Sequence, residues 1–339
     1  MAKTKLYAKI MIMQRILIIK TSSLGDVIHN LPVIADIKRH IPDAKIDWLV
    51  EESFADIPSL HHDVNTVMTV ALRRWRKQLF TYNTWLEIRQ LKRQIQATNY
   101  DLIIDTQGLL KSGLMSSIAS GIKYGYDKNS IREPLASCFY NQKYAVSKHL
   151  HAVERNRLLV AKSLDYSIEN IPLDYGISAT HISQLNLPMN FIVGLHATSR
   201  DSKLWVAEYW VQLAELLHEL GLSLVLPWGN MVEKIRAEII AKQAKNIVVL
   251  PKLSIAELAG VISLSKAAVG VDTGLAHLAV ALNKPTVAIY VDTNPQLTGL
   301  YGNPLITVNL GGDLKSGLTQ MPTPTLVMQS LHHILGSQK

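Results

Sequence analysis

The segment AAVGVDTGLAHLAVAL, residues 267–282, decides the fold. Residues 267–271 form an apolar run typical of a buried β-strand, and Asp272, Thr273 and Gly274 interrupt it. The apolar pattern then resumes at helical spacing. The segment therefore predicts a strand, a tight turn and the start of a helix, which is the repeating unit of an α/β protein.

The turn itself has two interpretations. Gly274 leaves room for a ligand, and the first backbone N–H groups of the following helix favour a phosphate. Asp272 or Thr273 is equally suited to cap the helix, as in any α/β protein. The turn alone does not separate a phosphate site from an ordinary helix cap.

The same alternation of short apolar runs and amphipathic segments extends along the chain. In the first half we expect strands at 16–20, 45–50 and 102–105 and helices at 28–39 and 86–96. In the second half we expect strands at 191–196, 223–227, 247–249 and 286–290 and helices at 207–220, 232–242 and 255–263. This organisation predicts two Rossmann-like domains with parallel sheets, a break within 178–190 and a ligand cleft where the domains join.

Length and composition agree with two domains. The 339 residues are 48% hydrophobic, which suffices for substantial cores. The one cysteine, Cys138, excludes an intramolecular disulfide framework, fits a reducing compartment and is expected in the core. No apolar run would span a bilayer and no signal peptide is recognisable, so we expect a cytoplasmic protein. Residues 1–12 precede the first strand pattern and are expected to be a dispensable extension.

Positive charge is concentrated in the first half. Lys and Arg outnumber Asp and Glu by 24 to 17 in residues 1–180, and by only 11 to 10 in the remainder. Nucleic acid, an anionic membrane or an acidic substrate would each suit such a surface. The cluster RRWRK at 73–77 interleaves cations with an aromatic residue, but no nucleic-acid-binding motif accompanies it, and a solvated surface is the alternative.

Polar residues that follow the expected strands are candidates for a site, because ligands of parallel sheets bind beyond the carboxyl ends of the strands. Asp26 begins the helix after the first strand, where it suits either a cleft-facing carboxylate or a cap. The hydroxyls and cations after a strand of the second half suit a phosphate: Thr198, Ser199, Arg200 and Lys203. The aromatic ring of Trp228 and the carboxylate of Glu233 suit a nucleoside. Trp228 is equally suited to packing.

Several common nucleotide and metal motifs are missing from the sequence. No GxGxxG follows the first strand, and there is no GxxxxGK[ST], HExxH or CxxC. This disfavours a nicotinamide dehydrogenase, a P-loop kinase and a metallohydrolase.

A family resemblance is carried by an ordered set of motifs: KTSSLGDVIHNLP, ALRRWRKQLF, YDLIIDTQGLLKSGL, REPLASCFYN, LHATSRDSKLW, LPWGN and VDTGLAHLAVAL. From Met13 to beyond Tyr301 the chain resembles the lipopolysaccharide heptosyltransferases of glycosyltransferase family 9, in particular those that attach the first core heptose. The resemblance implies a GT-B fold, with two Rossmann-like domains whose parallel sheets face each other across a cleft. It implies an acceptor-binding domain at 13–180, a donor-binding domain at 190–320 and a C-terminal helix at 321–339 that packs back on the N-terminal domain.

The resemblance also implies an activity. It is the inverting, metal-independent transfer of L-glycero-D-manno-heptose from ADP-heptose to the first Kdo sugar of Kdo2-lipid A, without a cofactor or metal. The partners would be the donor, the lipid acceptor and the anionic surface of the inner membrane, with peripheral attachment on its cytoplasmic face and no nucleic acid.

Residue roles follow from the same resemblance. Asp26 would be the general base, and Lys203 would bind the donor phosphates and act in catalysis. The other donor-binding residues would be Thr198, Ser199, Trp228, Glu233, Leu253, Asp272, Thr273, Gly274 and His277. The acceptor would be bound by Arg73, Arg74, Arg76, Arg132, His151 and Arg155.

Two alternatives stay open at this stage. One is a related heptosyltransferase that adds the second core heptose. The other is a non-catalytic protein that binds a nucleotide sugar or an anionic lipid.

Overall fold

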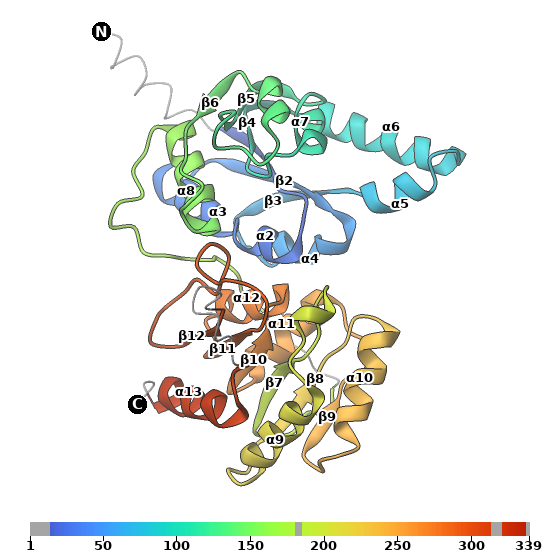
Figure 1. Cartoon of the computed structure of the whole chain (residues 1–339). Helices are drawn as coiled ribbons and strands as arrows, with labels where there is room; N and C mark the ends of the chain where they lie inside the picture. The colour runs from blue at the N-terminus through green and yellow to red at the C-terminus, as the bar shows by residue number, and fades with distance from the viewer. Residues whose placement is uncertain (1–13, 180–184, 313–320, 337–339) are drawn as a thin grey trace. The chain divides into compact units, whose positions relative to one another are not determined.

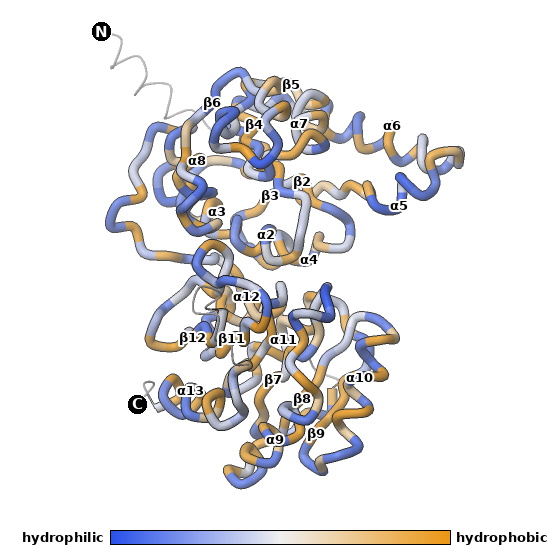
Figure 2. Tube along the Cα trace, viewed as in Figure 1, coloured by the Kyte–Doolittle hydropathy of each residue, from blue (hydrophilic) through white to orange (hydrophobic). Residues whose placement is uncertain are grey.

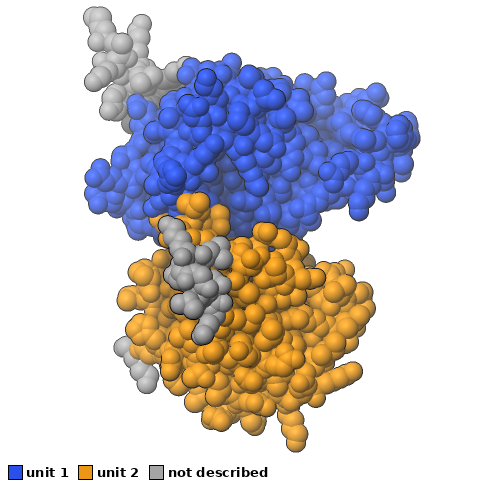
Figure 3. Space-filling view, in the orientation of Figure 1, with its two compact units in different colours: residues 1–176 blue, residues 177–339 orange. Residues whose placement is uncertain are grey.

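The computed structural model describes residues 14–179, 185–312 and 321–336 (Figure 1). The chain divides into two compact units, Met1–Gly176 and Ile177–Lys339 (Figure 3). The division falls just before segment 178–190, in which the sequence predicts a break. The expected extension at 1–12 lies outside the described residues.

The first unit is built on a six-stranded sheet in the order β3-β2-β1-β4-β5-β6, with every strand parallel to its neighbour. Its strands are β1 (Arg15–Ile19), β2 (Lys45–Glu51), β3 (Val64–Val70), β4 (Asn99–Asp105), β5 (Ser120–Tyr126) and β6 (Gln142–Tyr144). Its helices are α2 (Leu24–Ile28), α3 (Pro32–His40), α4 (Asp56–Ser59), α5 (Leu72–Lys77), α6 (Tyr82–Gln96), α7 (Leu110–Ser116) and α8 (Ala152–Leu164), with 3-10 turns η1 (Glu52–Phe54) and η2 (Pro134–Phe139).

The second unit has a six-stranded parallel sheet in the order β12-β11-β10-β7-β8-β9. Its strands are β7 (Phe191–Leu195), β8 (Ser223–Leu226), β9 (Ile247–Val249), β10 (Ala267–Val271), β11 (Thr286–Tyr290) and β12 (Thr307–Gly311). Its helices are α9 (Ala207–His218), α10 (Met231–Ala241), α11 (Ile255–Leu264), α12 (Gly274–Ala281) and α13 (Pro324–Gly336), with a 3-10 turn η3 (Asp201–Lys203).

The two sheets have the same strand order when each is numbered from its own first strand. In both, the chain winds outward in one direction, returns to the centre and winds outward in the other, as in a doubly wound Rossmann fold. The direction reverses between β1 and β4 in the first unit and between β7 and β10 in the second. Ligands of such sheets bind beyond the carboxyl ends of the strands at this switch point. The predicted α/β class with two Rossmann-like domains is confirmed.

Each sheet has its own hydrophobic core. The central strands consist mainly of apolar residues, as Figure 2 shows for β7 and β8. In the first unit Leu17 and Ile19 of β1 are fully buried. In the second, the rings of Trp205 and Trp210 meet edge to face with centroids 5.0 Å apart. These cores fix the strand ends from which the site residues project.

The C-terminal helix lies in the second unit. α13 buries Val327, Leu331 and Ile334 in the core of that unit, and it contacts α9, β11 and β12. Trp205 Nε1 donates a hydrogen bond of 2.8 Å to the carbonyl oxygen of Pro322, just before the helix. The apolar face of the helix therefore covers the second sheet, and its docking on the N-terminal domain stays a prediction.

Some expectations differ from the structure. The helix expected at 28–39 corresponds to α3 and begins only at Pro32, because proline is favoured at the first position of a helix, and Ile28 is instead the last residue of the separate short helix α2. Four strands, β3, β5, β6 and β12, have no counterpart among the predicted elements. Cys138, expected in the core, is exposed. In the part of the chain that the structure describes, no helix combines the length and apolarity needed to cross a bilayer.

Candidate active site

Three side chains converge on Asp272, directly after β10 at the switch point of the second unit. The ammonium group of Lys203 lies 2.5 Å from Asp272 Oδ2, and Thr293 Oγ1 donates to the same oxygen at 2.7 Å. Thr198 Oγ1 donates to the backbone carbonyl oxygen of Asp272 at 2.9 Å. The side chains of Lys203 and Asp272 are 12% and 16% exposed, so the pair is reachable from solvent. The structure thus brings together three residues predicted from the sequence, and it adds Thr293, which follows β11.

The turn after Asp272 opens helix α12. Thr273 is the N-cap residue in extended conformation, and its side chain makes no capping hydrogen bond. Gly274 is the first helical residue, and His277 lies buried one turn further along. The helix start therefore presents its backbone N–H groups and the positive end of its dipole beside Lys203, which is an environment for an anion.

Glu233 and Trp228 are already engaged in the loop after β8. Glu233 Oε2 accepts a 2.6 Å hydrogen bond from the backbone N–H of Gly229, and Oε1 accepts a 2.7 Å bond from the side chain of Asn230. Trp228 Nε1 donates to the carbonyl oxygen of Leu250 at 2.7 Å. These contacts shape the loop. The remaining predicted donor residues, Ser199 and Leu253, lie on the same edge after β7 and β9, the first exposed and the second partly buried.

Asp26 lies in the turn after β1, at the switch point of the first unit. Its Oδ2 accepts hydrogen bonds from the backbone N–H of Ser23 at 2.8 Å and from Ser23 Oγ at 3.0 Å, which closes a capping box on α2. The capping interpretation is therefore realised. Within the described residues, no hydrogen bond or ion pair occupies the second oxygen, Oδ1, and the residue is partly exposed. Asp26 can cap the helix with one oxygen and accept a proton with the other.

Lys20 lies beneath this turn and was not predicted as a site residue. It is 6% exposed, and its ammonium group donates to the carbonyl oxygen of Thr106 at 2.9 Å and to Asn156 Oδ1 at 3.5 Å. Burial lowers the pKa of Lys20, and the negative charges of Asp26 and Asp105 partly oppose that shift. A charged residue that ends the apolar run RILIIK is the signal that could have identified it.

Gln107 fixes the backbone of the same turn. Its Oε1 accepts 3.0 Å hydrogen bonds from the backbone N–H groups of both Thr21 and Ser22. Gln107 follows β4, so the two strands that flank the switch point jointly hold the turn. Asp105, at the end of β4, is buried and accepts from Tyr140 Oη at 2.7 Å; burial raises the pKa of this carboxyl group.

Three of the predicted acceptor residues lie around this switch point. The positive charges of Arg155 and Arg132 contribute to lowering the pKa of Lys20, so both guanidinium groups lie near its ammonium group. Arg155 donates to the carbonyl oxygen of Ser130 at 2.7 Å, and its guanidinium lies 5.1 Å from the ring centroid of Tyr126. His151 is the N-cap of α8 and accepts from the backbone N–H of Val153, so its ring is held by the helix start.

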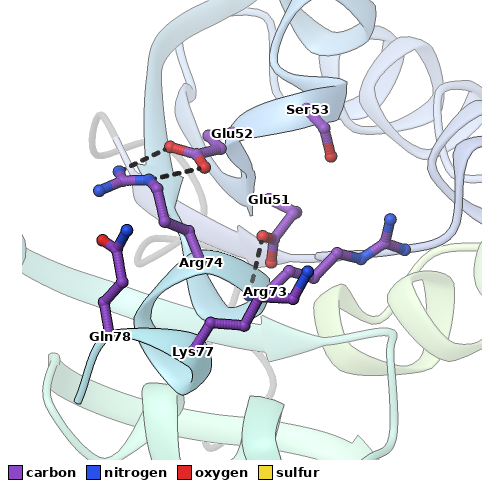
Figure 4. Close-up of a pocket in the computed structure, with 7 residues that line it drawn as sticks. All are labelled: Glu51, Glu52, Ser53, Arg73, Arg74, Lys77 and Gln78. Carbon is purple, nitrogen blue, oxygen red and sulfur yellow. Dashed lines mark hydrogen bonds and ion pairs between the residues drawn. The ribbon is translucent and has the colours of Figure 1, made fainter. Parts of the chain in front are cut away.

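The basic cluster forms a separate pocket of about 350 Å³ (Figure 4). It lies between the end of β2 and helix α5, and it is lined by Glu51, Glu52, Ser53, Arg73, Arg74, Lys77 and Gln78. Because β2 and β3 are the first and second neighbours of β1 in the sheet, this pocket and Asp26 share the carboxyl edge of the first unit.

The arginines of the cluster differ in how they are engaged. Arg74 forms ion pairs of 2.9 Å with Glu52 and with Glu87, and these hydrogen bonds raise the pKa of Arg74. The guanidinium of Arg73 lies 5.2 Å from the ring centroid of Phe54 and points away from Glu52 in Figure 4. Arg76 is exposed. Arg74 thus anchors α5, whereas Arg73 and Arg76 remain available to an anionic ligand.

One group of possible metal ligands occurs among the described residues. Ligand atoms of His61, His62 and Asp63 lie within 4.8 Å of one another. His61 Nδ1 accepts from the backbone N–H of Asp63, and His62 Nε2 lies 3.1 Å from Asp63 Oδ2. These residues precede β3, so they lie at the amino edge of the sheet, opposite the candidate site.

Known proteins match the chain across both units. Residues 88–319 match the model of glycosyltransferase family 9 (heptosyltransferase). Lipopolysaccharide heptosyltransferase 1 of Escherichia coli K12 is 47% identical over 292 residues, covering 85% of this chain and 91% of that protein.

Solved structures match as well. The Escherichia coli heptosyltransferase WaaC with ADP has a TM-score of 0.85 at 42% identity, over 94% of this chain and 99% of that one. The same protein with ADP-2-deoxy-2-fluoro heptose has a TM-score of 0.82 at 42% identity, over 93% and 98%. With the family model spanning most of the chain and the fold repeated in both units, the chain belongs to glycosyltransferase family 9, the heptosyltransferases.

Proposed function

We propose that this heptosyltransferase transfers L-glycero-D-manno-heptose from ADP-heptose to the first Kdo sugar of Kdo2-lipid A. The observation that carries the proposal is the convergence of Lys203, Thr198 and Thr293 on Asp272 at the start of α12. The similar structures that contain ADP and an ADP-heptose analogue support the donor. The sequence match to a heptosyltransferase 1 supports the first-heptose acceptor.

The second unit binds the donor in this proposal. Lys203 and the N-terminus of α12 meet the diphosphate, because both present positive charge to an anion at the switch point. Thr198, Ser199, Thr273, Gly274 and His277 complete the anionic end. The loop carrying Trp228 and Glu233, with Leu253 beside it, receives the nucleoside; Glu233 shapes this loop through its bonds to Gly229 and Asn230.

The chemical step is a single displacement with inversion. The acceptor hydroxyl oxygen forms a bond to the anomeric carbon of the heptose while its proton passes to Oδ1 of Asp26. The bond from the anomeric carbon to the β-phosphate oxygen breaks, and its electron pair leaves with ADP. Lys203 and the helix N-terminus stabilise the charge that grows on the β-phosphate, so the step needs no metal ion.

The first unit binds the acceptor. Arg73 and Arg76 meet its carboxylates and phosphates beside the pocket, with Arg74 as the anchor of α5. Arg132, Arg155 and His151 provide a second group of contacts near Asp26. The protein would work at the cytoplasmic face of the inner membrane, where the basic surface of this unit meets anionic lipid.

A purified-component assay tests the proposal. The enzyme is incubated with ADP-heptose and either Kdo2-lipid A or heptosylated Kdo2-lipid A, with and without EDTA, and ADP release and product mass are measured. We expect ADP release and addition of one heptose only with Kdo2-lipid A, unchanged by EDTA, and an inverted anomeric centre by NMR.

Each other outcome corrects a defined part. Transfer only to the heptosylated acceptor would assign the second-heptose reaction. Inhibition by EDTA that added Mg²⁺ reverses would overturn the metal-independent step. Binding of both ligands without ADP release would assign a non-catalytic protein.

A further inference from the structure

The pocket of the first unit continues into an arm with an apolar corner. α5 and α6 leave the sheet after β3 and return to it at β4, and the corner between them is residues 78–81 (Figure 1). Around this corner Phe80 is 104% exposed, Tyr82 76% and Trp85 58%, with Leu79 and Leu86 also exposed. Contiguous exposed apolar side chains of this size mark an interaction surface.

The arm does not need these side chains for its own packing. The inner face of α6 buries Thr84, Leu91 and Ile95, the last two within the core that also contains Trp75 of α5. Figure 2 shows the resulting alternation of apolar and polar residues along α6. The rings at the corner lie outside this core.

The corner is held in a defined conformation. Thr81 caps α6 by accepting a hydrogen bond from the backbone N–H of Thr84, and its hydroxyl donates to the carbonyl oxygen of Gln78 at 2.9 Å. Trp85 Nε1 donates to the carbonyl oxygen of Leu79 at 2.9 Å. The exposed rings thus project from an ordered turn.

Cations surround the apolar corner on the side toward the body of the unit. Tyr82, Trp85 and Leu86 share one helical face with Arg89, Lys92 and Arg93, because three- and four-residue steps return to the same side of a helix. On α5, Arg76 and Lys77 precede the corner. Among the residues that the structure describes, no side-chain hydrogen bond or ion pair engages these five cations.

We propose that the corner of the arm, defined as Leu79, Phe80, Tyr82, Trp85 and Leu86, inserts into the interface of an anionic phospholipid bilayer. Amphipathic aromatic rings favour the headgroup region of a bilayer. Their insertion would bring the adjacent cations to the depth of the lipid phosphates. Charge complementarity selects the bilayer over a second copy of the chain. In a symmetric dimer through this face, unpaired cations of the two copies would face each other.

The inference deepens the proposed function and rests on it for its purpose, since that acceptor is a membrane lipid. α5 contributes both to the pocket and to the start of the corner. Insertion of the corner would therefore hold Arg73 and Lys77 near the plane of the lipid headgroups, where an acceptor sugar leaves the bilayer.

A vesicle-flotation experiment without donor or acceptor tests the surface. The full chain is mixed with vesicles of phosphatidylethanolamine and phosphatidylglycerol, or with neutral phosphatidylcholine vesicles. We compare the wild type, the triple variant Phe80→Ser, Tyr82→Ser, Trp85→Gln, and the charge variant Arg89→Gln, Lys92→Gln, Arg93→Gln. Leu305→Ser, an exposed apolar position of the second unit, is the matched control.

We expect the wild type and the control to bind anionic vesicles, weakly at high salt, and to bind neutral vesicles poorly. Each variant should lose about tenfold or more in vesicle binding, since insertion and charge act together. Brominated lipid should quench part of the tryptophan fluorescence of the wild type. The variant Trp85→Phe should lack this quenched part. Thermal unfolding and ADP binding verify that the variants fold.

An activity comparison separates this surface from the active site. The triple variant should retain turnover on acceptor dispersed in detergent and lose about tenfold on acceptor embedded in vesicles, in proportion to its lost binding. Vesicle binding equal to wild type in the triple variant would overturn the proposal. So would a wild-type dimer, seen by sedimentation, that the triple variant abolishes. If vesicles bind as expected but no heptose is transferred, the proposed function fails and the membrane surface stands.

Discussion

A lysine and an aspartate lie at the switch point of each unit, and the two arrangements differ. In the second unit Lys203 and Asp272 form a direct ion pair of 2.5 Å that is partly open to solvent. In the first unit Lys20 is buried and bonded to a carbonyl oxygen and an amide oxygen, while Asp26 is bonded only to Ser23 in the described structure.

The difference follows the demands of the two proposed roles. A lysine that must meet an arriving diphosphate needs solvent access, and Thr293 can keep Asp272 hydrogen-bonded when Lys203 turns to the ligand. A base needs an oxygen that no protein donor occupies. The buried Lys20 instead serves as a fixed part of the framework beneath the turn. The comparison therefore predicts unequal effects of substitution at Asp26, Lys203 and Lys20.

The largest effect is expected from Asp26→Asn. An amide oxygen can still accept the bonds from Ser23 that begin α2, but it cannot take the proton of the acceptor hydroxyl. We expect kcat to fall by about 10²–10⁴-fold, the usual contribution of a general base, with the Kd for ADP unchanged. Steady-state kinetics and calorimetry measure the two quantities.

The control for this variant is Asp101→Asn, since Asp101 accepts from the backbone N–H of Arg15 at the opposite end of the strands. It should retain wild-type turnover. Turnover of Asp26→Asn near the wild-type level would remove Asp26 from the role of base and leave it as a helix cap.

A smaller effect is expected from Lys203→Ala. In the proposed mechanism the variant removes the cation that meets the leaving phosphate, and in the structure it leaves the carboxylate of Asp272 with the hydrogen bond from Thr293. We expect kcat/KM for ADP-heptose to fall by about 10²–10³-fold, as for the loss of one electrostatic contact to a developing charge. In contrast to Asp26→Asn, binding of ADP should also weaken.

Lys245→Ala, an exposed lysine before β9 at the other edge of the same sheet, is the matched control and should leave both quantities unchanged. Unaltered ADP affinity in Lys203→Ala would contradict a phosphate contact and would restrict Lys203 to supporting Asp272.

How much the sequence predicts depends on how local the determining interactions are. Strands such as β7 and β10 are short apolar runs ended by polar turns, and they were predicted to within a residue. β3 and β12 lie at sheet edges and are only partly buried. Each contains polar residues among its apolar ones, and these weaken the apolar pattern that predicts a strand. The helix expected at 28–39 was placed to begin too early, because the apolar residues before Pro32 continue its pattern and Pro32 was not recognised as the helix start.

The same distinction holds for the site. Asp26, Lys203 and Asp272 follow predicted strands, so their positions on the carboxyl edges could be anticipated. The pairing of Lys203 with Asp272 joins residues 69 positions apart, and Lys20 meets Thr106 across 86 positions. Such partners depend on strand order, which the sequence pattern did not specify. Glu233 differs from these pairs, because its carboxylate bonds Gly229 and Asn230, which are near neighbours in the sequence, and these contacts were not predicted.

The smallest effect on turnover is expected from Lys20→Met, which tests the framework role of the buried lysine. Methionine fills much of the same volume but leaves the carbonyl oxygen of Thr106 without its ammonium donor and removes the contact to Asn156. Loss of a buried donor costs about 1–3 kcal/mol of stability, and for a domain of this size Tm falls by about 2–4 °C per kcal/mol. Because Asp26 and its bonds to Ser23 remain, kcat should fall by no more than about tenfold, through a less well-held turn. Calorimetry of unfolding and steady-state kinetics on the same preparation measure both.

Lys45→Met, at an exposed lysine at the start of β2, is the control and should change neither Tm nor kcat. A loss of turnover as large as that of Asp26→Asn, with Tm unchanged, would instead make Lys20 a participant in the chemical step and would make the lysine–aspartate pairs of the two units functionally alike.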